Sequence, residues 1–219
     1  MSAPPSDRTE VRRLAERGEY DRTVIDAILD EALVCHVGLV IDGSPVVIPM
    51  LHARDGDTLY LHGSPASRLL RAMRHDVEAC VTVTLLDGIA LARAPFHSSV
   101  NYRSVVMYGR PHTVDDPEEK RRAFEVLTDH VTPGRWADCR LPTAKEEKGT
   151  LVAAMSIDEA SAKVRTGPPV DDEEDYTLPI WAGVVPLSLV AGDPIDDPQL
   201  QAGLELPGYL KGYQRPTAD

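Results

Sequence analysis

Two clusters of polar residues in this sequence have the side chains and the spacing to bind a small molecule. The first is His62-Gly63-Ser64, which is followed by Ser67-Arg68. A strand that ends at a Gly-Ser turn and continues into a helix N-terminus brings backbone N–H groups, hydroxyls and a guanidinium to one point, which suits an anion such as a phosphate. The same residues also fit a capped helix whose arginine is solvated, so both interpretations stay open.

The second cluster precedes the apolar run Val105–Tyr108. Its hydrogen-bonding residues are His97-Ser98-Ser99 and Asn101-Tyr102-Arg103-Ser104. So many donors at the entrance of a strand can hydrogen-bond a polar heterocycle, or they can satisfy the backbone of a polar loop. Both interpretations are consistent with the sequence.

Metal ligation would have to use five widely separated residues, and no pair among them has the spacing of zinc ligands. These residues are Cys35, His36, His52, His62 and His97. We therefore expect no metal site. The run Asp171–Asp175 lacks the alternation and the glycine of a calcium loop, which predicts a solvated loop. The motifs of Rossmann dinucleotide sites, P-loops, α/β-hydrolases and zincins are also absent from the sequence.

The charge of the chain restricts its partners. Its 219 residues include 23 Lys and Arg and 35 Asp and Glu, a formal net charge of −12. Nucleic acid and anionic membranes are repelled by such a chain at long range, so neither is expected as a partner. An anionic ligand must meet a local basic site, and the segment His62–Arg68 contains no acidic residue.

The cysteines and the apolar runs bear on the cellular compartment. Cys35, Cys80 and Cys139 form no Cys-x-x-Cys pair, and the longest apolar run, Leu33–Ile41, is too short to cross a membrane. The first residues contain no apolar core of a signal peptide. We therefore expect a reduced, cytoplasmic protein.

The elements that position the two clusters follow from hydrophobic periodicity. Apolar residues at helical spacing predict a helix over 23–33, and Asp116-Pro117 predicts the capped start of another that reaches His130. A further helix over 64–74 is expected to have Ser64 as its cap. Strands are predicted over 34–41, 46–53, 58–62, 77–86, 89–93, 102–114, 151–157, 162–165 and 181–190.

Most of these strands follow one another through tight turns such as Asp42-Gly43-Ser44-Pro45. This order predicts an α+β fold, an antiparallel Greek-key barrel with peripheral helices. Pro49 inside the second strand indicates a bulge or an edge, where backbone groups are free. We expect disorder over 1–9, one domain over 10–195 and a tail over 196–219.

An ordered series of segments carries a family resemblance over about residues 10–190. The segments are Arg17–Arg22, Asp42–Pro49, Leu59–Ser64, Asn101–Val106, Gly109, Lys163 and Trp181–Pro186. Together they resemble the pyridoxamine phosphate oxidase-like, FMN-binding split-barrel superfamily, in its flavin-nucleotide-binding or nitroimidazole-resistance-like branch. The resemblance implies a split barrel and a homodimer that holds FMN at the subunit interface.

The resemblance also assigns cofactor-binding residues. The strand containing Pro49, Met50 and Leu51 would contact the flavin ring through its main chain. The phosphate would be held by His62, Gly63, Ser67 and Arg68. Where the oxidases carry an Arg-Lys pair, this chain has Arg68-Leu69 and so lacks one cation.

The late segments complete the implied site. Asn101, Arg103 and Ser104 match the polar residues near the ring, and Trp181 matches the late Trp-Gly motif. His97, Tyr102 and Arg103 are the catalytic candidates, which would orient or protonate an acceptor. The C-terminal Arg and His that bind pyridoxal phosphate in the oxidases have no counterpart after Trp181, so vitamin oxidation is not implied.

The resulting functional expectation is an FMN-dependent oxidoreductase that passes electrons from NAD(P)H to a small acceptor such as a nitroaromatic or a quinone. One alternative keeps the fold but binds haem or a deazaflavin. Its candidate axial ligands are His36, His52, His62 and His97. Another alternative is a non-catalytic protein that binds or senses flavin.

Overall fold

One antiparallel sheet dominates the structure, a computed structural model that describes residues 3–215. Its ten strands are β1 (Gly18–Glu19), β2 (Val34–Ile41), β3 (Ser44–Asp55), β4 (Thr58–Gly63), β5 (Ala79–Leu91), β6 (Ser99–Gly109), β7 (His112–Thr113), β8 (Leu151–Ser156), β9 (Ala160–Arg165) and β10 (Gly183–Pro186). The strand order is β1-β9-β6-β5-β2-β3-β4-β8-β7, and β10 pairs with β5. The sheet does not close, so the predicted α+β split barrel is confirmed.

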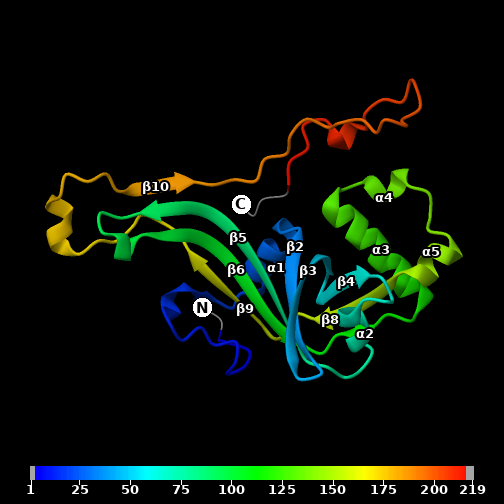
Figure 1. Cartoon of the computed structure of the whole chain (residues 1–219), viewed down its shortest axis with the longest axis horizontal. Coiled ribbons are helices and arrows are strands. Elements are labelled where there is room, and N and C mark those ends of the chain that lie inside the picture. The colour runs from blue at the N-terminus through cyan, green and yellow to red at the C-terminus, as the bar shows by residue number, and fades with distance from the viewer. Residues whose placement is uncertain (1–2, 216–219) are drawn as a thin grey trace.

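Five α-helices lie on the periphery of the sheet in the described part of the chain (Figure 1). They are α1 (Arg22–Glu31), α2 (Arg68–Ala72), α3 (Pro117–Val131), α4 (Arg135–Asp138) and α5 (Ala144–Gly149). Asp21 caps α1 and Asp116 caps α3, because each carboxylate accepts from N–H groups of the first turn. No helix within residues 3–215 has the length and apolar character needed to cross a membrane.

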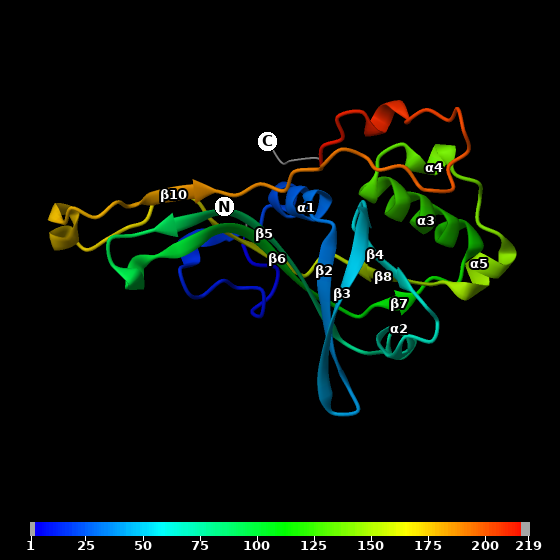
Figure 2. The ribbon, with the colours of Figure 1, turned by 45° about the horizontal axis from the view of Figure 1, so that its top comes forward.

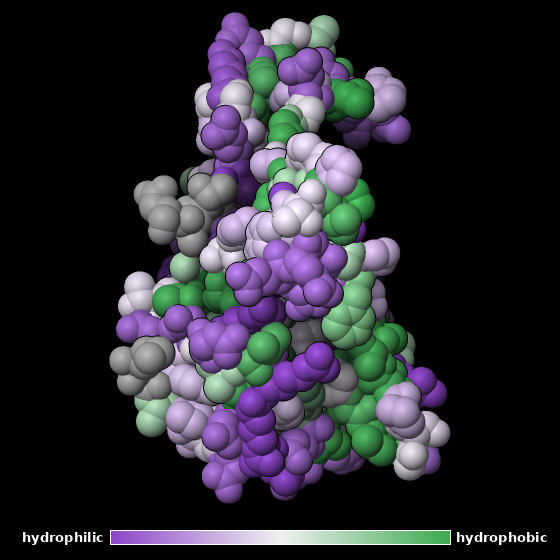
Figure 3. All heavy atoms as spheres, turned by 90° about the vertical axis from the view of Figure 1, so that its left-hand side faces the viewer, coloured by the Kyte–Doolittle hydropathy of each residue, from purple (hydrophilic) through white to green (hydrophobic). Residues whose placement is uncertain are grey.

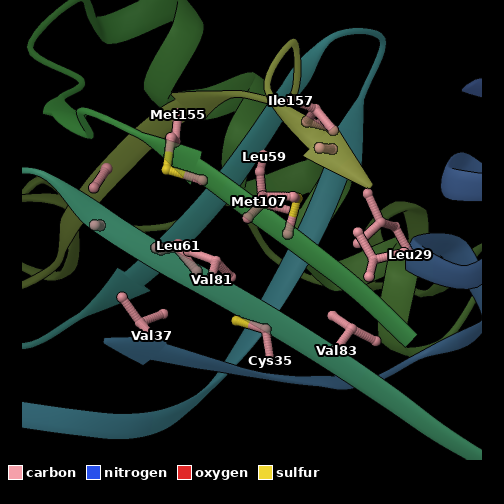
Figure 4. Packing of buried hydrophobic residues seen from close by; sticks show 14 of the residues in the cluster. Leu29, Cys35, Val37, Leu59, Leu61, Val81, Val83, Met107, Met155 and Ile157 are labelled. Atoms are coloured by element: carbon pink, nitrogen blue, oxygen red, sulfur yellow. The ribbon is translucent and has the colours of Figure 1, made fainter. Parts of the chain in front are cut away.

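The main core fills the barrel interior, where apolar side chains from alternate strand positions meet (Figure 4). In β2, Cys35 and Val37 are fully buried, whereas Val34 and His36, which alternate with them, are exposed. Each large side chain buried in this way contributes about 1.5–3 kcal/mol through removal of apolar surface from water.

A second, smaller core lies between α3 and the face of β3, β4 and β8 that points away from the barrel interior. Ala53 and Tyr60 from the sheet pack there against Ala123 and Leu127 of α3. This packing holds α3 against the sheet.

β5 and β6 extend far beyond the barrel, and β10 runs along β5 to form an arm (Figure 1). Figure 3 views the molecule from the side of the arm's tip and shows hydrophobic patches exposed beside hydrophilic ones. The prediction of two strands joined by a turn at Asp87-Gly88 is wrong, because β5 is continuous and has a bulge between Leu86 and Gly88. A Cβ at Gly88 would lie 3.1 Å from the Val185 carbonyl oxygen, so the glycine permits the close approach of β10.

Two local predictions about turns and caps have different outcomes. The Asp42-Gly43 hairpin turn is confirmed, and both residues have positive φ angles, 50° and 75°. The prediction that Ser64 caps the next helix is wrong. Ser67 is the cap, and its hydroxyl accepts from the Leu70 N–H, because α2 begins only at Arg68.

Pro49 lies in an uninterrupted register with β2, opposite His36, so no bulge occurs there. β3 pairs with β4 only from His52 onward, and Pro49 therefore lies in the part of β3 whose second edge is free of β4. The edge interpretation of this proline is the one that holds.

The N-terminal segment was expected to be disordered, and residues 1–2 lie outside the described part. Residues 3–9 form turns in which Thr9 is buried. Arg8 forms ion pairs with Glu78 and Glu159. These contacts hold the segment against the end of the sheet.

Candidate cofactor site

A cavity of about 710 Å³ lies between the β3–β4 face and helices α3–α5. We call it the helix pocket. Its apolar lining residues are Leu51, Phe124, Leu127, Val131 and Trp136. Polar lining residues include His62, Arg135, Cys139, Arg140 and Glu146. A concave, mostly apolar site with a few polar groups is typical of a cofactor site.

Strand alternation explains why Leu51 and His62 line this pocket. Ala53 and Tyr60 pack against α3, and side chains two residues apart on a strand share a face. Leu51 and His62 therefore lie on the α3 side of β3 and β4. His52 lies on the opposite side of β3, in the closed interior.

His62 is the one lining residue with an unsatisfied buried ring nitrogen. Its Nδ1 is buried and has no hydrogen-bond partner among residues 3–215. Burial lowers the pKa of the imidazole below its usual value, so the ring is neutral at pH 7. His62 borders the cavity, a neutral imidazole is a common ligand for haem iron, and the surrounding apolar wall suits a porphyrin.

Two arginines at the helix pocket carry charges that suit carboxylates. The Arg140 guanidinium binds the Glu146 carboxylate with N–O distances of 2.6 and 2.8 Å, and Arg135 donates to the Tyr209 hydroxyl at 3.1 Å. Glu146 is itself fixed by the Thr143 capping box of α5. Sequence reasoning missed this wall, because α4 and α5 span only four and six residues and show no helical periodicity.

The predicted phosphate segment lies at the turn from β4 to α2. Ser67, and not the expected Ser64, caps α2. The Arg68 side chain is exposed and makes no hydrogen bond or ion pair with the rest of the described chain. Its guanidinium is therefore available to an anion, and Gly63 adjoins the same turn.

The second predicted cluster lies apart from the first, beside another cavity of about 740 Å³. We call it the arm pocket. It lies between the start of the arm and the C-terminal segment, and Thr84, Leu86, Arg103, Leu187 and Tyr213 are among its lining residues. His62 lines the helix pocket and Arg103 lines the arm pocket, so the structure does not bring the two clusters into one cavity.

Arg103 is held between two carboxylates. Its guanidinium lies 2.5 Å from Glu31 and 2.8 Å from Asp87. Hydrogen bonds to Glu31 and then to Asp87 raise the pKa of the guanidinium above its ordinary value. Arg103 is therefore a fixed cation, which can orient a ligand but does not release a proton near neutral pH.

The neighbours of Arg103 on β6 are used within the sheet. The Asn101 amide donates to the Gly167 carbonyl at 3.1 Å and accepts from Arg165, and the Ser104 hydroxyl donates to the Lys163 carbonyl at 3.2 Å. These bonds agree with the interpretation that the polar segment forms its hydrogen bonds within the protein. Tyr102 pairs with Leu86 and Arg165 across the sheet.

His97 and Trp181 lie on the arm, outside the lining of both cavities. The His97 ring lies 3.2 Å from the Asp172 carboxylate, and ligand atoms of His97, Asp172 and Asp175 lie within 4.8 Å of one another.

The prediction that Asp171–Asp175 is a solvated loop is wrong at Asp171. Its side chain is fully buried and accepts from the Arg93 and Ala94 N–H groups.

The remaining histidine candidates for an axial ligand have no open cavity. His52 is fully buried, its Nε2 lies 3.1 Å from the Leu29 carbonyl oxygen, and its ring lies 5.2 Å from that of His130. Burial, followed by the His130 charge, lowers the pKa of His52 to about 4. His36 is exposed on the outer face of β2.

The outer face of β2 and β3 carries exposed apolar side chains. Val40 and Val47 each expose 62% of their surface, and Val34, Pro49 and Leu51 are exposed beside them. Met50 is partly buried and packs against the barrel core instead. An apolar strand face of this kind marks a binding or association surface.

Comparisons with known proteins agree with this architecture. A split barrel with these elements defines a class of flavin-binding proteins. A family model described as pyridoxamine 5'-phosphate oxidase matches residues 21–164, and the chain therefore belongs to that family. No curated protein matches the chain.

Two solved structures are similar over almost the whole chain. The flavocytochrome Anf3 from Azotobacter vinelandii is 42% identical, with a TM-score of 0.90, over 95% of this chain and 97% of that chain. The FAD and heme binding protein from Mycobacterium smegmatis is 40% identical, with a TM-score of 0.86, over 90% and 96%. A Bacteroides thetaiotaomicron protein, linked in name to 5-nitroimidazole antibiotic resistance, is 28% identical, with a TM-score of 0.55, over 67% and 86%.

Proposed function

We propose that this protein is a flavin-dependent oxidoreductase that also binds haem, and that it carries electrons from NAD(P)H to a small acceptor. The observation that carries the proposal is the neutral His62 ring, with an unpartnered buried nitrogen, in the apolar wall of the helix pocket. The similarity to a flavocytochrome and to an FAD and heme binding protein supports the same conclusion.

The chemistry of the helix pocket fits a haem, and its volume of about 710 Å³ lies in the usual range of ligand pockets. His62 would supply the axial ligand, and Leu51, Phe124 and Trp136 would contact the porphyrin. Arg135, which donates to the neutral Tyr209 hydroxyl and forms no ion pair within residues 3–215, would pair with a propionate. A bound haem would supply one-electron transfer, while the protein would set the polarity of the pocket and the access of small molecules to it.

The flavin would lie against the outer face of β3, with Ser67 and Arg68 at its phosphate. Leu51 belongs both to that exposed face and to the lining of the helix pocket, so the two cofactors would adjoin there. The exposed apolar side chains on this face, Val40 and Val47 above all, suit contact with a second copy of the chain, and we propose a homodimer. Val47→Glu is expected to convert that dimer to monomer in analytical ultracentrifugation.

The flavin nucleotide is expected to be FMN from the family resemblance, whereas the mycobacterial relative is described as binding FAD. Heat release followed by chromatography of the free flavin distinguishes FMN from FAD.

A nitroaromatic or a quinone is the proposed acceptor class. Bound flavin without NAD(P)H-dependent reduction in an anaerobic stopped-flow experiment would favour the alternative of a flavin-sensing protein.

The test of haem binding is the absorption spectrum of the purified protein supplemented with haem. We expect a Soret band that His62→Ala abolishes or shifts, because that residue supplies the ligand. His75→Ala replaces an exposed histidine outside the lining of both cavities; it is the matched control and should leave the band unchanged. A spectrum that is the same in both variants contradicts the proposal.

A further inference from the structure

The described part of the C-terminal segment returns across the molecule and reaches the ends of two helices at Arg215. Figure 2 shows this segment passing above α3 and α4 before it turns back. We call residues 208–215 the strap. It contains the short helical turn Gly208–Leu210 and ends at Arg215 in the described part of the chain.

Arg215 binds the C-terminal ends of α1 and α3 at the same time. Its guanidinium donates to the Asp30 and Glu31 carbonyl oxygens, each at 3.0 Å. It also donates to the His130 carbonyl oxygen, and at 3.5 Å to that of Val131. The last carbonyl groups of a helix have no partner within the helix and carry partial negative charge, so one guanidinium here stabilises two helix ends.

Two tyrosines extend the attachment toward α4. The Tyr213 hydroxyl donates to the Val131 carbonyl at 2.6 Å, and the Tyr209 hydroxyl accepts from Arg135 at 3.1 Å. Gly134, between α3 and α4, has a φ of 85°, and a Cβ there would lie 3.8 Å from the Tyr209 ring. The strap therefore holds the corner at which the chain turns from α3 into α4.

The anchored corner is also a wall of the helix pocket. Val131 and Arg135 line that cavity, and their partners Tyr213, Arg215 and Tyr209 all belong to the strap. We propose that the strap is a positioning element that keeps this wall closed and thereby retains the ligand of the helix pocket, with Arg215 as its main positioning residue. The identity of that ligand as haem rests on the proposed function.

The test uses the full chain and two measurements. One is the rate of haem transfer from the loaded protein to an excess of apomyoglobin. The other is hydrogen–deuterium exchange at residues 132–139 of the haem-free protein, which needs no bound cofactor. The variants are Arg215→Met and Tyr213→Phe. Lys211→Met is the matched control, because Lys211 lies on the same strap and its exposed side chain makes no hydrogen bond or ion pair within residues 3–215.

We expect Arg215→Met to release haem about tenfold faster and Tyr213→Phe about threefold faster, as the loss of charged and neutral hydrogen bonds predicts. Both should also speed exchange at the α3–α4 corner, while Lys211→Met behaves as wild type. Equal rates in all variants in both measurements would overturn the proposal. If Arg215→Met does not fold, as judged by circular dichroism, Tyr213→Phe decides.

If the wild-type protein takes up no haem, the proposed function fails and the exchange comparison alone decides the role of the strap. Faster exchange in Arg215→Met than in Lys211→Met supports the strap in that case. Equal exchange overturns it.

Discussion

The helix pocket and the arm pocket have similar volumes, about 710 and 740 Å³, but His62 in the first and Arg103 in the second differ in whether the protein already satisfies them. In the helix pocket, His62 keeps a buried nitrogen without a partner. At the arm pocket, Arg103 is bound by Glu31 and Asp87. The comparison teaches that a polar cluster marks a ligand site only where the fold leaves its hydrogen-bonding capacity unused.

The same distinction applies to the two histidines on either side of the β3–β4 sheet. His52 and His62 each have a buried Nδ1 without a partner. His62 borders a cavity, whereas His52 is enclosed by the core and lies beside His130. The former is placed to bind a ligand, and the latter is a core residue whose neutrality is needed for folding.

The largest expected effect is therefore the acid sensitivity of the fold. His52 has a folded-state pKa of about 4 and an unfolded value near 6.5, so the unfolded chain binds more protons between these pH values. The free energy of unfolding should fall by about 3 kcal/mol as the pH decreases from 6.5 to 4. Urea unfolding at several pH values measures this change in the free energy of unfolding. His52→Gln should flatten this dependence, and an equally steep profile in the variant would contradict the assignment.

The next largest effect is expected from replacing Arg103, whose guanidinium stabilises the fold by pairing with two carboxylates. Arg103→Met leaves the Glu31 and Asp87 carboxylates without their guanidinium in a mostly buried setting. We expect a loss of about 2 kcal/mol in the free energy of unfolding, with haem affinity unchanged. Arg121→Met, on the exposed surface of α3, is the control. Normal stability together with lost cofactor binding would contradict the structural role of Arg103 and would make the arm pocket the ligand site.

The smallest effect is expected at the free cation of the β4–α2 turn. Arg68→Met should leave the free energy of unfolding within about 0.5 kcal/mol of wild type, because the exposed side chain has no protein partner. It should weaken flavin binding about tenfold by removing one charged phosphate contact. Fluorescence titration with FMN and FAD measures this, with Arg71→Met as the control on the same helix. Unchanged affinity for both nucleotides would remove Arg68 from the phosphate site.

Local signals in the sequence were sufficient for much of the fold. Helix α1 follows from apolar spacing, α3 follows from the cap at Asp116-Pro117, and the β2–β3 hairpin follows from Asp42-Gly43. The predicted turn at Asp87-Gly88 was wrong, because the residue types of a turn also occur at a β-bulge. The distinction depends on β10, which reaches Gly88 from almost 100 residues further along the chain.

The site was less predictable, because its properties come from tertiary contacts. His62 was identified by its place at the end of a strand, and the structure puts it in a cavity. The partner of Arg103, Glu31, is 72 residues away, so no local pattern shows that the arginine is occupied. The opposite wall, with Trp136 and Arg140, comes from helices too short to carry a periodic signal.

The most direct test of the central claim is imidazole rescue of His62→Gly. The account predicts that this variant, supplemented with haem, lacks the wild-type Soret spectrum, and that added imidazole restores it by occupying the vacated position. The result that would contradict the account is a variant with the wild-type spectrum in the absence of imidazole. That outcome would show that the ring of His62 does not hold the haem.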